Sequence, residues 1–326
     1  MSDPRTAAWY LRFAAEARGQ SALFEEWATG VAGDEEVLTL IERLPLDRRQ
    51  PNLVFAVSRL LGVPLEGYAV WREWLIRSWD SVASEAIRRT TQTNEPLRSA
   101  VLLPALGMID GPIALLEVGA SAGLCLVPDR YSYRYVDAAG LELARLDPSD
   151  GRSTVVLECL VSGEVPLPGA LPIIVWRAGI DLNPLDVSDA DDARWLETLV
   201  WPEQADRLER IRAAAAIVRA HPPTITVGDA VDALAEAAAA APSDATLVVM
   251  SSAMLAYLAP VDRQRFIDEV HRLGARWISL EGQQVLPTVR DQLPTIPGTD
   301  PAAFVLALDG TPRAFASPHG RYLDWF

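Results

Sequence analysis

Cysteines, basic side chains and long apolar runs are all scarce in this sequence. The two cysteines, Cys125 and Cys159, are too few for a disulfide framework, and their spacing is not that of a metal site. Lysine and arginine together number 29 against 44 acidic residues, and this negative charge argues against binding to nucleic acid or to an anionic membrane. We therefore expect a small-molecule substrate, with a protein as a second possible partner.

The apolar stretches do not have the form of a targeting or membrane segment. The first stretch, MSDPRTAAWYLRFAAEARG, places charged side chains among apolar ones, unlike a signal peptide. The most apolar region, residues 101–127, is interrupted by Asp110, Pro112 and Glu117 and cannot span a bilayer. Together with the few cysteines, these features predict a cytoplasmic protein with reduced thiols.

A change of pattern near residue 110 predicts two domains. Before it, apolar residues recur at intervals of three and four, as around Trp71 and Trp79, which is typical of helices that pack their tryptophans in a core. After it, short apolar runs alternate with helical stretches, which is typical of a buried, mostly parallel sheet. The sequence thus predicts an all-helical N-terminal domain over 1–110 and an α/β domain over 111–326.

Five short runs are the predicted strands of the sheet: PIALLEVG, PIIVWRAG, TITVGD, TLVVMSS and RWISLEG. Between the first two lies a segment rich in turn residues, which we expect to be an insertion near 128–170. Near the end, AFVLALDGTPRAFAS turns at Asp309-Gly310 and predicts a C-terminal antiparallel hairpin on the edge of the sheet.

The stretch LLEVGASAGLCL contains two overlapping motifs. Gly119 to Gly123 fits G-x-S-x-G, the turn that presents a nucleophilic serine in hydrolases, with Ser121 and a late histidine, His319, in the required chain order. That fold needs strands before the turn to supply oxyanion donors, whereas everything upstream is predicted helical. Missing donors cost roughly 3 to 4 kcal/mol of transition-state stabilisation, so the hydrolase is the alternative hypothesis.

The same turn also fits a nucleoside-cofactor site on the first strand of a parallel sheet. Its glycines allow the backbone to approach a ligand, and a following helix is expected to direct its N-terminus at the ligand. Acidic residues then end three strands in series, namely Glu117, Asp181 and Asp229. Such residues accept hydrogen bonds from ribose hydroxyls or an exocyclic amine.

This pattern resembles class I S-adenosylmethionine-dependent methyltransferases, with E-x-G-x-x-x-G, GIDLNP and VGDA on successive strands. The resemblance implies a Rossmann-like domain whose cofactor contacts its methionine part with Gly119, Ala120, Ser121 and Gly123, its ribose with Asp181 and Leu182, and its adenine with Asp229 and Ala230. Glu117 would lie beside the loop, and Ser251 is a further residue expected to bind the cofactor. The chain departs from the pattern in the long segment before Asp181 and in SSAML after the fourth strand.

Over nearly its whole length, in QTNEP, DLNPLD, RWLETLVWPEQ and PHG, the chain is also similar to the bacterial domain-of-unknown-function family 2332.

Three residues are the candidate catalytic groups. His319, in a loop after the last strand, could lie at the rim of a cleft or be a solvated loop histidine. Glu281 ends the fifth strand and could be an acid or base, or an ordinary carboxylate. Asn94, with Gln92 and Thr93, could contact ligand or cap a helix.

We therefore expect a methyltransferase that uses S-adenosylmethionine, no metal, and a small-molecule acceptor, less readily a protein. A serine hydrolase using Ser121 and His319 is the alternative. A non-catalytic interaction protein on a methyltransferase-like fold is the third hypothesis.

Overall fold

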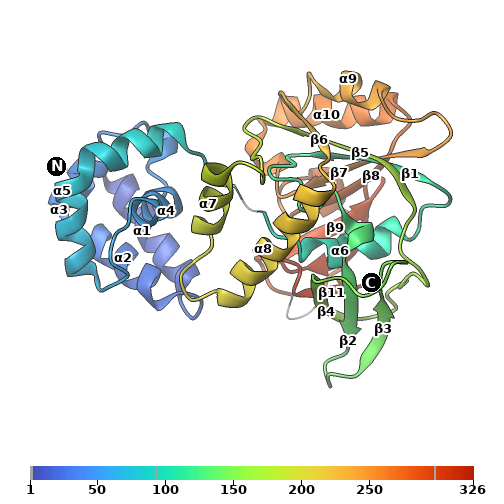
Figure 1. Cartoon of the computed structure of the whole chain (residues 1–326), viewed down its shortest axis with the longest axis horizontal. Coiled ribbons are helices and arrows are strands. Elements are labelled where there is room, and N and C mark those ends of the chain that lie inside the picture. The colour runs from blue at the N-terminus through green and yellow to red at the C-terminus, as the bar shows by residue number, and fades with distance from the viewer. Residues whose placement is uncertain (1–2, 93, 297–298) are drawn as a thin grey trace. The chain divides into compact units, whose positions relative to one another are not determined.

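The structure, a computed structural model, describes residues 3–92, 94–296 and 299–326 (Figure 1). Contacts divide the chain into two compact units, each built from two segments. The helical unit comprises residues 1–93 and 188–212, and the sheet unit comprises residues 94–187 and 213–326. The division is therefore not a single boundary near residue 110, because a later segment returns to the helical unit.

The helices assigned to the helical unit are α1 (Pro4–Ala17), α2 (Ala22–Ala32), α3 (Glu35–Ile41), α4 (Pro51–Leu60), α5 (Tyr68–Arg88) and α7 (Ala190–Thr198), with a short 3-10 helix, η1 (Leu46–Arg48). Side chains of Asp3, Ser21 and Asp34 accept hydrogen bonds from amides in the first turns of α1, α2 and α3, which fixes where these helices begin.

Aromatic side chains form the core of the helical unit. Trp27 and Trp71 stack with ring centroids 5.5 Å apart, and Phe55 meets Trp71 edge-on at 5.3 Å. From the returning segment, Trp201 packs 5.4 Å from Phe13. The interpretation of the tryptophan spacing as packing is thus confirmed for Trp71 and Trp79, which are both buried.

The sheet unit contains one sheet of eleven described strands. They are β1 (Ile113–Val118), β2 (Ser132–Val136), β3 (Glu142–Leu146), β4 (Val156–Ser162), β5 (Ile174–Asp181), β6 (Thr224–Val227), β7 (Thr246–Ser252), β8 (Arg276–Gly282), β9 (Phe304–Leu308), β10 (Thr311–Ala316) and β11 (Tyr322–Trp325). Their order is β3-β2-β4-β11-β10-β9-β8-β7-β1-β5-β6, and most neighbouring pairs are parallel.

The five predicted parallel strands are confirmed as β1, β5, β6, β7 and β8. Numbered by their appearance in the chain, they lie in the order 3-2-1-4-5 across the sheet. The order reverses between β1 and β7: the next of the five strands after β1 is β5 on one side, whereas the next after β7 is β8 on the other. In open parallel sheets this reversal opens a crevice at the carboxyl ends of the strands.

The segment near 128–170 lies between the first two predicted strands and contributes β2, β3 and β4, which join the same sheet through β11. Two predictions about this unit are wrong. The hairpin does turn at Asp309 and Gly310, both at positive φ, but it lies inside the sheet rather than at its edge, since β10 pairs with β11. No α-helix lies between β1 and β2, and none can start in the turn, because Gly119, Ser121 and Gly123 all have positive φ, which a right-handed helix does not admit.

Helices lie on both faces of the sheet. Leu116 and Val118 belong to a core cluster with residues of α9 (Leu234–Ala239), α10 (Pro260–Arg272) and α11 (Pro287–Arg290). Between these side chains Glu117 points the opposite way, toward the charge of Arg98 on α6 (Arg98–Leu106). The remaining elements are α8 (Ala205–Ala220), which runs from the second segment of the helical unit into the sheet unit, and two 3-10 helices, η2 (Pro128–Arg130) and η3 (Leu255–Tyr257).

No helix in the described part of the chain is long and apolar enough to cross a membrane. Both cysteines are buried, and burial raises the pKa of the Cys159 thiol to about 12. Among the described residues, no three His, Cys, Asp or Glu side chains are grouped to hold a metal ion.

Candidate functional site

The glycine turn after β1 is held tightly against β5. The amides of Gly119 and Ala120 both donate to the Ile180 carbonyl, at 2.8 and 3.2 Å. This close approach requires glycine at position 179, because a Cβ there would lie 2.5 Å from the Ala120 Cβ. The positive φ of Ser121, 49°, is uncommon for a residue other than glycine and marks a constrained turn.

All five amide N–H groups from Gly119 to Gly123 donate within the protein. Beyond the first two, Ser121 donates to Asp181 Oδ2 at 2.8 Å, Ala122 to Asn94 Oδ1 at 2.9 Å and Gly123 to the Ala120 carbonyl at 2.7 Å. Loops that bind phosphate direct such N–H groups at the ligand. This turn therefore offers a phosphate no backbone donors.

Two buried carboxylates lie at the carboxyl ends of β1 and β8. Glu117 is 5 % exposed and Glu281 is 2 % exposed, and the Oε2 atom of each has no hydrogen-bond partner among the described residues. Burial raises the pKa of Glu117 well above its usual range and that of Glu281 to about 7, although the positive charge of Arg98 lowers both. An acceptor oxygen left unpaired in a protein interior is costly, so it points to a missing donor or cation.

The arginines near these carboxyl groups donate their hydrogen bonds to backbone carbonyls. Arg98 donates to the carbonyls of Pro318 at 2.8 Å and Ser252 at 3.4 Å, and Arg263 donates to the Leu255 carbonyl at 3.0 Å. The carboxyl ends of β1 and β8 therefore keep two buried carboxyl oxygens that no arginine binds.

The loop that carries His319 is joined to the start of α6. The Arg98 bond reaches Pro318, and a Cβ on Gly320 would lie 2.2 Å from the Leu97 carbonyl oxygen. The structure thus brings the His319 loop to Arg98, next to the carboxyl end of β7 at Ser252. His319 is partly buried.

Asp181 is the last residue of β5 and Asp229 follows β6, so both lie at carboxyl ends of strands, as predicted. Asp181 accepts from Ser121 N–H and Asn183 N–H, and Asp229 Oδ1 accepts from the amides of Val231 and Asp232. Both are only partly buried, so unused carboxylate lone pairs can still reach a ligand. Beside Asp181, the apolar side chain of Leu182 is 63 % exposed.

Met254 covers the glycine turn. A Cβ on Gly119 would lie 2.7 Å from the Met254 Cγ, so the methionine occupies the space that this glycine leaves open. Its loop is fixed by Glu281, whose Oε1 accepts from the amides of Met254 and Leu255, both at 3.1 Å. Ala253, with φ 55°, makes the turn from β7 into this loop.

Three of the predicted site residues are engaged in contacts within the protein. Ser251 is fully buried and accepts from the Trp277 indole, and Ala230 belongs to the core cluster of α9 and α10. Asn94 does not cap a helix: its amide holds Ser121 Oγ and the Ala122 N–H. Thr93 lies outside the described residues.

The hydrolase geometry has little support at Ser121. The oxyanion donor expected there is the N–H of the following residue, Ala122, and this group is bonded to Asn94. The side chain of Ser121 is buried and its hydroxyl accepts from Asn94.

Arg98 and Met254 were not found by sequence reasoning. Arg98 sits on a short helix before β1 and Met254 in a loop after β7, and neither belongs to a local motif. The SSAML departure after the fourth strand was the one signal that pointed near Met254.

Comparison with known proteins adds a family. A family model with the description "Uncharacterized protein conserved in bacteria (DUF2332)" matches residues 65–325, which include every candidate site residue. No curated protein and no solved structure matches the chain.

Proposed function

Because the chain belongs to this bacterial family, whose description names no reaction, we propose its function from the site: an S-adenosylmethionine-dependent methyltransferase that acts on a small molecule. The observation that carries the proposal is the chemical character of the edge. The glycine turn has no free N–H group, while Glu117 and Glu281 each keep an unpaired buried oxygen.

The strand order supports a Rossmann-type binding domain, and the charge selects among its ligands. The order 3-2-1-4-5 is that of dinucleotide-binding sheets, but those domains place a pyrophosphate on a helix N-terminus. Here no α-helix lies between β1 and β2, and the carboxyl ends of β1 and β8 carry the buried Glu117 and Glu281. A sulfonium and an ammonium group, together with ribose hydroxyls, are the donors and cations that such an edge suits.

The residues fit this cofactor as follows. Glu117 would stabilise positive charge beneath the turn, Asp181 and Asp229 would accept from the ribose and the adenine amine, and Leu182 would contact an apolar face of the cofactor. When bound, the cofactor supplies an electrophilic methyl group, and alignment of the acceptor is then the main requirement. Glu281, with a pKa of about 7, can hold a proton at Oε2, while Asn94 positions the turn through Ser121 and Ala122.

Calorimetric titration with S-adenosylmethionine, S-adenosylhomocysteine and NAD tests the proposal. We expect saturable binding of the first two and none of NAD. Glu117→Gln keeps the shape but cannot ionise when a cation binds. It should weaken the binding of S-adenosylmethionine by about ten- to a hundredfold, and that of S-adenosylhomocysteine, whose sulfur is uncharged, by less. Leu182→Ala should weaken both ligands, whereas Leu141→Ala, an equally exposed leucine beside β3 at the other end of the sheet, should change neither.

Asp181→Ala should cost roughly 1.5 to 3 kcal/mol of cofactor binding. Since Asp181 also anchors Ser121 N–H, Asp181→Asn, which keeps an acceptor oxygen, is the companion variant. No binding of either sulfur ligand, or an unchanged affinity in Glu117→Gln and Asp181→Asn, would refute the proposal. Labelling by a fluorophosphonate that is lost in Ser121→Ala would establish the hydrolase instead.

A further inference from the structure

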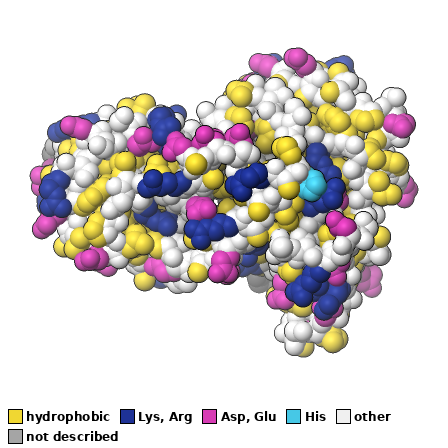
Figure 2. Space-filling model, viewed as in Figure 1, with side chains coloured by type: hydrophobic (Ala, Val, Ile, Leu, Met, Phe, Trp, Pro, Cys, Tyr) yellow, Lys and Arg dark blue, Asp and Glu magenta, His cyan; other side chains and the backbone are white. Residues whose placement is uncertain are grey.

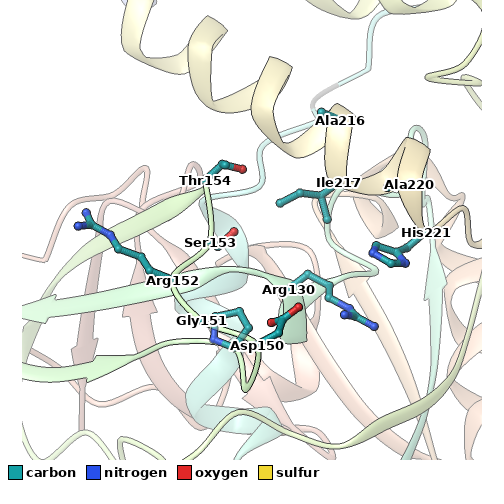
Figure 3. A pocket seen from close by; sticks show the side chains of 11 residues that line it. Arg130, Asp150, Gly151, Arg152, Ser153, Thr154, Ala216, Ile217, Ala220 and His221 are labelled. Carbon is teal, nitrogen blue, oxygen red and sulfur yellow. The ribbon is translucent and has the colours of Figure 1, made fainter.

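We propose that the sheet unit has a second ligand site, a surface pocket that binds a small organic phosphate. The pocket has a volume of about 330 Å³, in the lower part of the range for small-molecule sites. It is lined by Arg130 at the end of η2, by the connection between β3 and β4, and by the end of α8 with His221 (Figure 3).

The pocket has the opposite charge character to the carboxyl edge. Its lining includes two arginines, Arg130 and Arg152, and one carboxylate, Asp150. In a chain with a net charge of −15, such a local excess of arginine is a departure from the surrounding surface. On the face shown in Figure 2, basic side chains lie beside a histidine where Figure 1 places the end of α8.

The nearest acid to Arg130, Asp129, is shared with a second arginine. Asp129 lies 3.5 Å from the Arg130 Nε, but its two oxygens are bound by Arg177 at 2.8 and 2.9 Å. The Arg130 Nε is buried without a hydrogen-bond acceptor in the described part of the chain. Two arginines therefore share one carboxylate, which leaves an excess of positive charge beside the pocket, and Arg177 also fixes η2 against β5.

Other donors surround the same space. In Figure 3 the Arg130 guanidinium and the His221 ring lie on the same side of the pocket, whereas Arg152 points away from them. Arg152 has no hydrogen bond or ion pair with a described residue, so its long side chain is free to turn toward a ligand. The Ser153 hydroxyl accepts from the Val155 amide at 3.1 Å, which orients it while its own proton can be donated.

The volume of the pocket and its apolar lining residues indicate an organic phosphate rather than inorganic phosphate. Ile217, Pro148 and Ala220 supply apolar surface beside the charged groups. A phosphate monoester combines a doubly charged group, which two arginines and a histidine can bind, with a body that such surface can contact.

The pocket is separate from the proposed cofactor edge. His221 precedes β6 and lies toward its amino end, whereas Asp229 follows its carboxyl end. A strand of four residues spans about 13 Å. The inference therefore does not depend on the proposed methyl transfer.

Calorimetric titration of the full chain at low ionic strength with phenyl phosphate, inorganic phosphate and benzoate tests the site. Phenyl phosphate should bind saturably and more tightly than the other two, and less tightly as salt is added. Arg130→Gln should reduce its affinity about ten- to a hundredfold, and Asp150→Asn should increase it. Arg145→Gln removes the same charge from β3 outside the pocket and should leave the affinity unchanged.

Each other outcome overturns the inference. No binding of phenyl phosphate, or an equal loss in Arg130→Gln and Arg145→Gln, would mean that the arginines attract anions only weakly and without a site. Tighter binding of benzoate would assign the pocket to carboxylates. S-adenosylmethionine titrated into Arg130→Gln should bind as to the unmodified chain, which separates this result from a failure of the cofactor proposal.

Discussion

Between about pH 4.5 and pH 7, Glu281 keeps a proton in the folded protein that the unfolded chain releases. Burial raises its pKa from 4.5 to about 7, so stability from this group is present at low pH and is lost as pH rises between these values. Each pH unit in that window changes the free energy of unfolding by about 1.4 kcal/mol.

Glu281→Gln cannot ionise but keeps an oxygen for the amides of Met254 and Leu255. Relative to the unmodified protein, its free energy of unfolding should therefore rise between pH 5 and pH 8, by up to about 3 kcal/mol. Denaturant unfolding at each pH measures this difference. Glu236→Gln, on the exposed side of α9, is the control, and a difference that is the same at every pH would contradict the buried proton.

For single residues, the sequence predicted the positions of the acidic side chains at the strand ends but not the residues that contact them. Glu117, Asp181 and Asp229 lie at or just after the ends of short apolar runs, so their place at the strand ends is a local property. The contacts of Arg98 depend on residues more than 150 positions away, and no pattern near it predicts them.

At the scale of elements, the loop from β7 to α10 covers the glycine turn through Met254. A ligand that approaches Gly119 must displace this side chain. Met254→Ala should therefore raise the association rate of S-adenosylmethionine several-fold, because truncation removes the part that lies over Gly119. Stopped-flow measurement checks this, with Met108→Ala, an exposed methionine after α6, as control. An unchanged or lower rate would show that the loop does not limit access.

The elements that the sequence predicted share one property, which is that a local pattern encodes them. The five parallel strands are continuous apolar runs, and the β9–β10 hairpin has an Asp-Gly turn. The place of β2, β3 and β4 could not be predicted, because it depends on the pairing of Leu160 with Tyr322. The α-helix expected after β1 is absent because three of the five residues from 119 to 123 have positive φ, which the sequence pattern does not reveal.

At the scale of the molecule, the two units are interleaved along the chain, because residues 188–212 return to the helical unit. Trp201 in this segment packs on Phe13 and Phe24, and its indole donates to Asn52 at 3.0 Å. Trp201→Ala should therefore lower the free energy of unfolding by about 3 kcal/mol. Calorimetric unfolding measures this loss, and Tyr257→Ala, an 83 % exposed aromatic, is the control. Equal effects would mean that the returning segment does not stabilise the helical unit.

The pairing of β4 with β11 also has a consequence for synthesis. Ser162 on β4 and its partner Asp324 on β11 are 162 residues apart, and β11 alone connects β4 to β10. At ribosomal rates of about 5 to 20 residues per second, the edge of β4 waits roughly ten to thirty seconds for its neighbour. During that time the nascent chain presents an unpaired strand, and so protection by a chaperone or ribosome-bound factor would matter more for this protein than its final stability suggests.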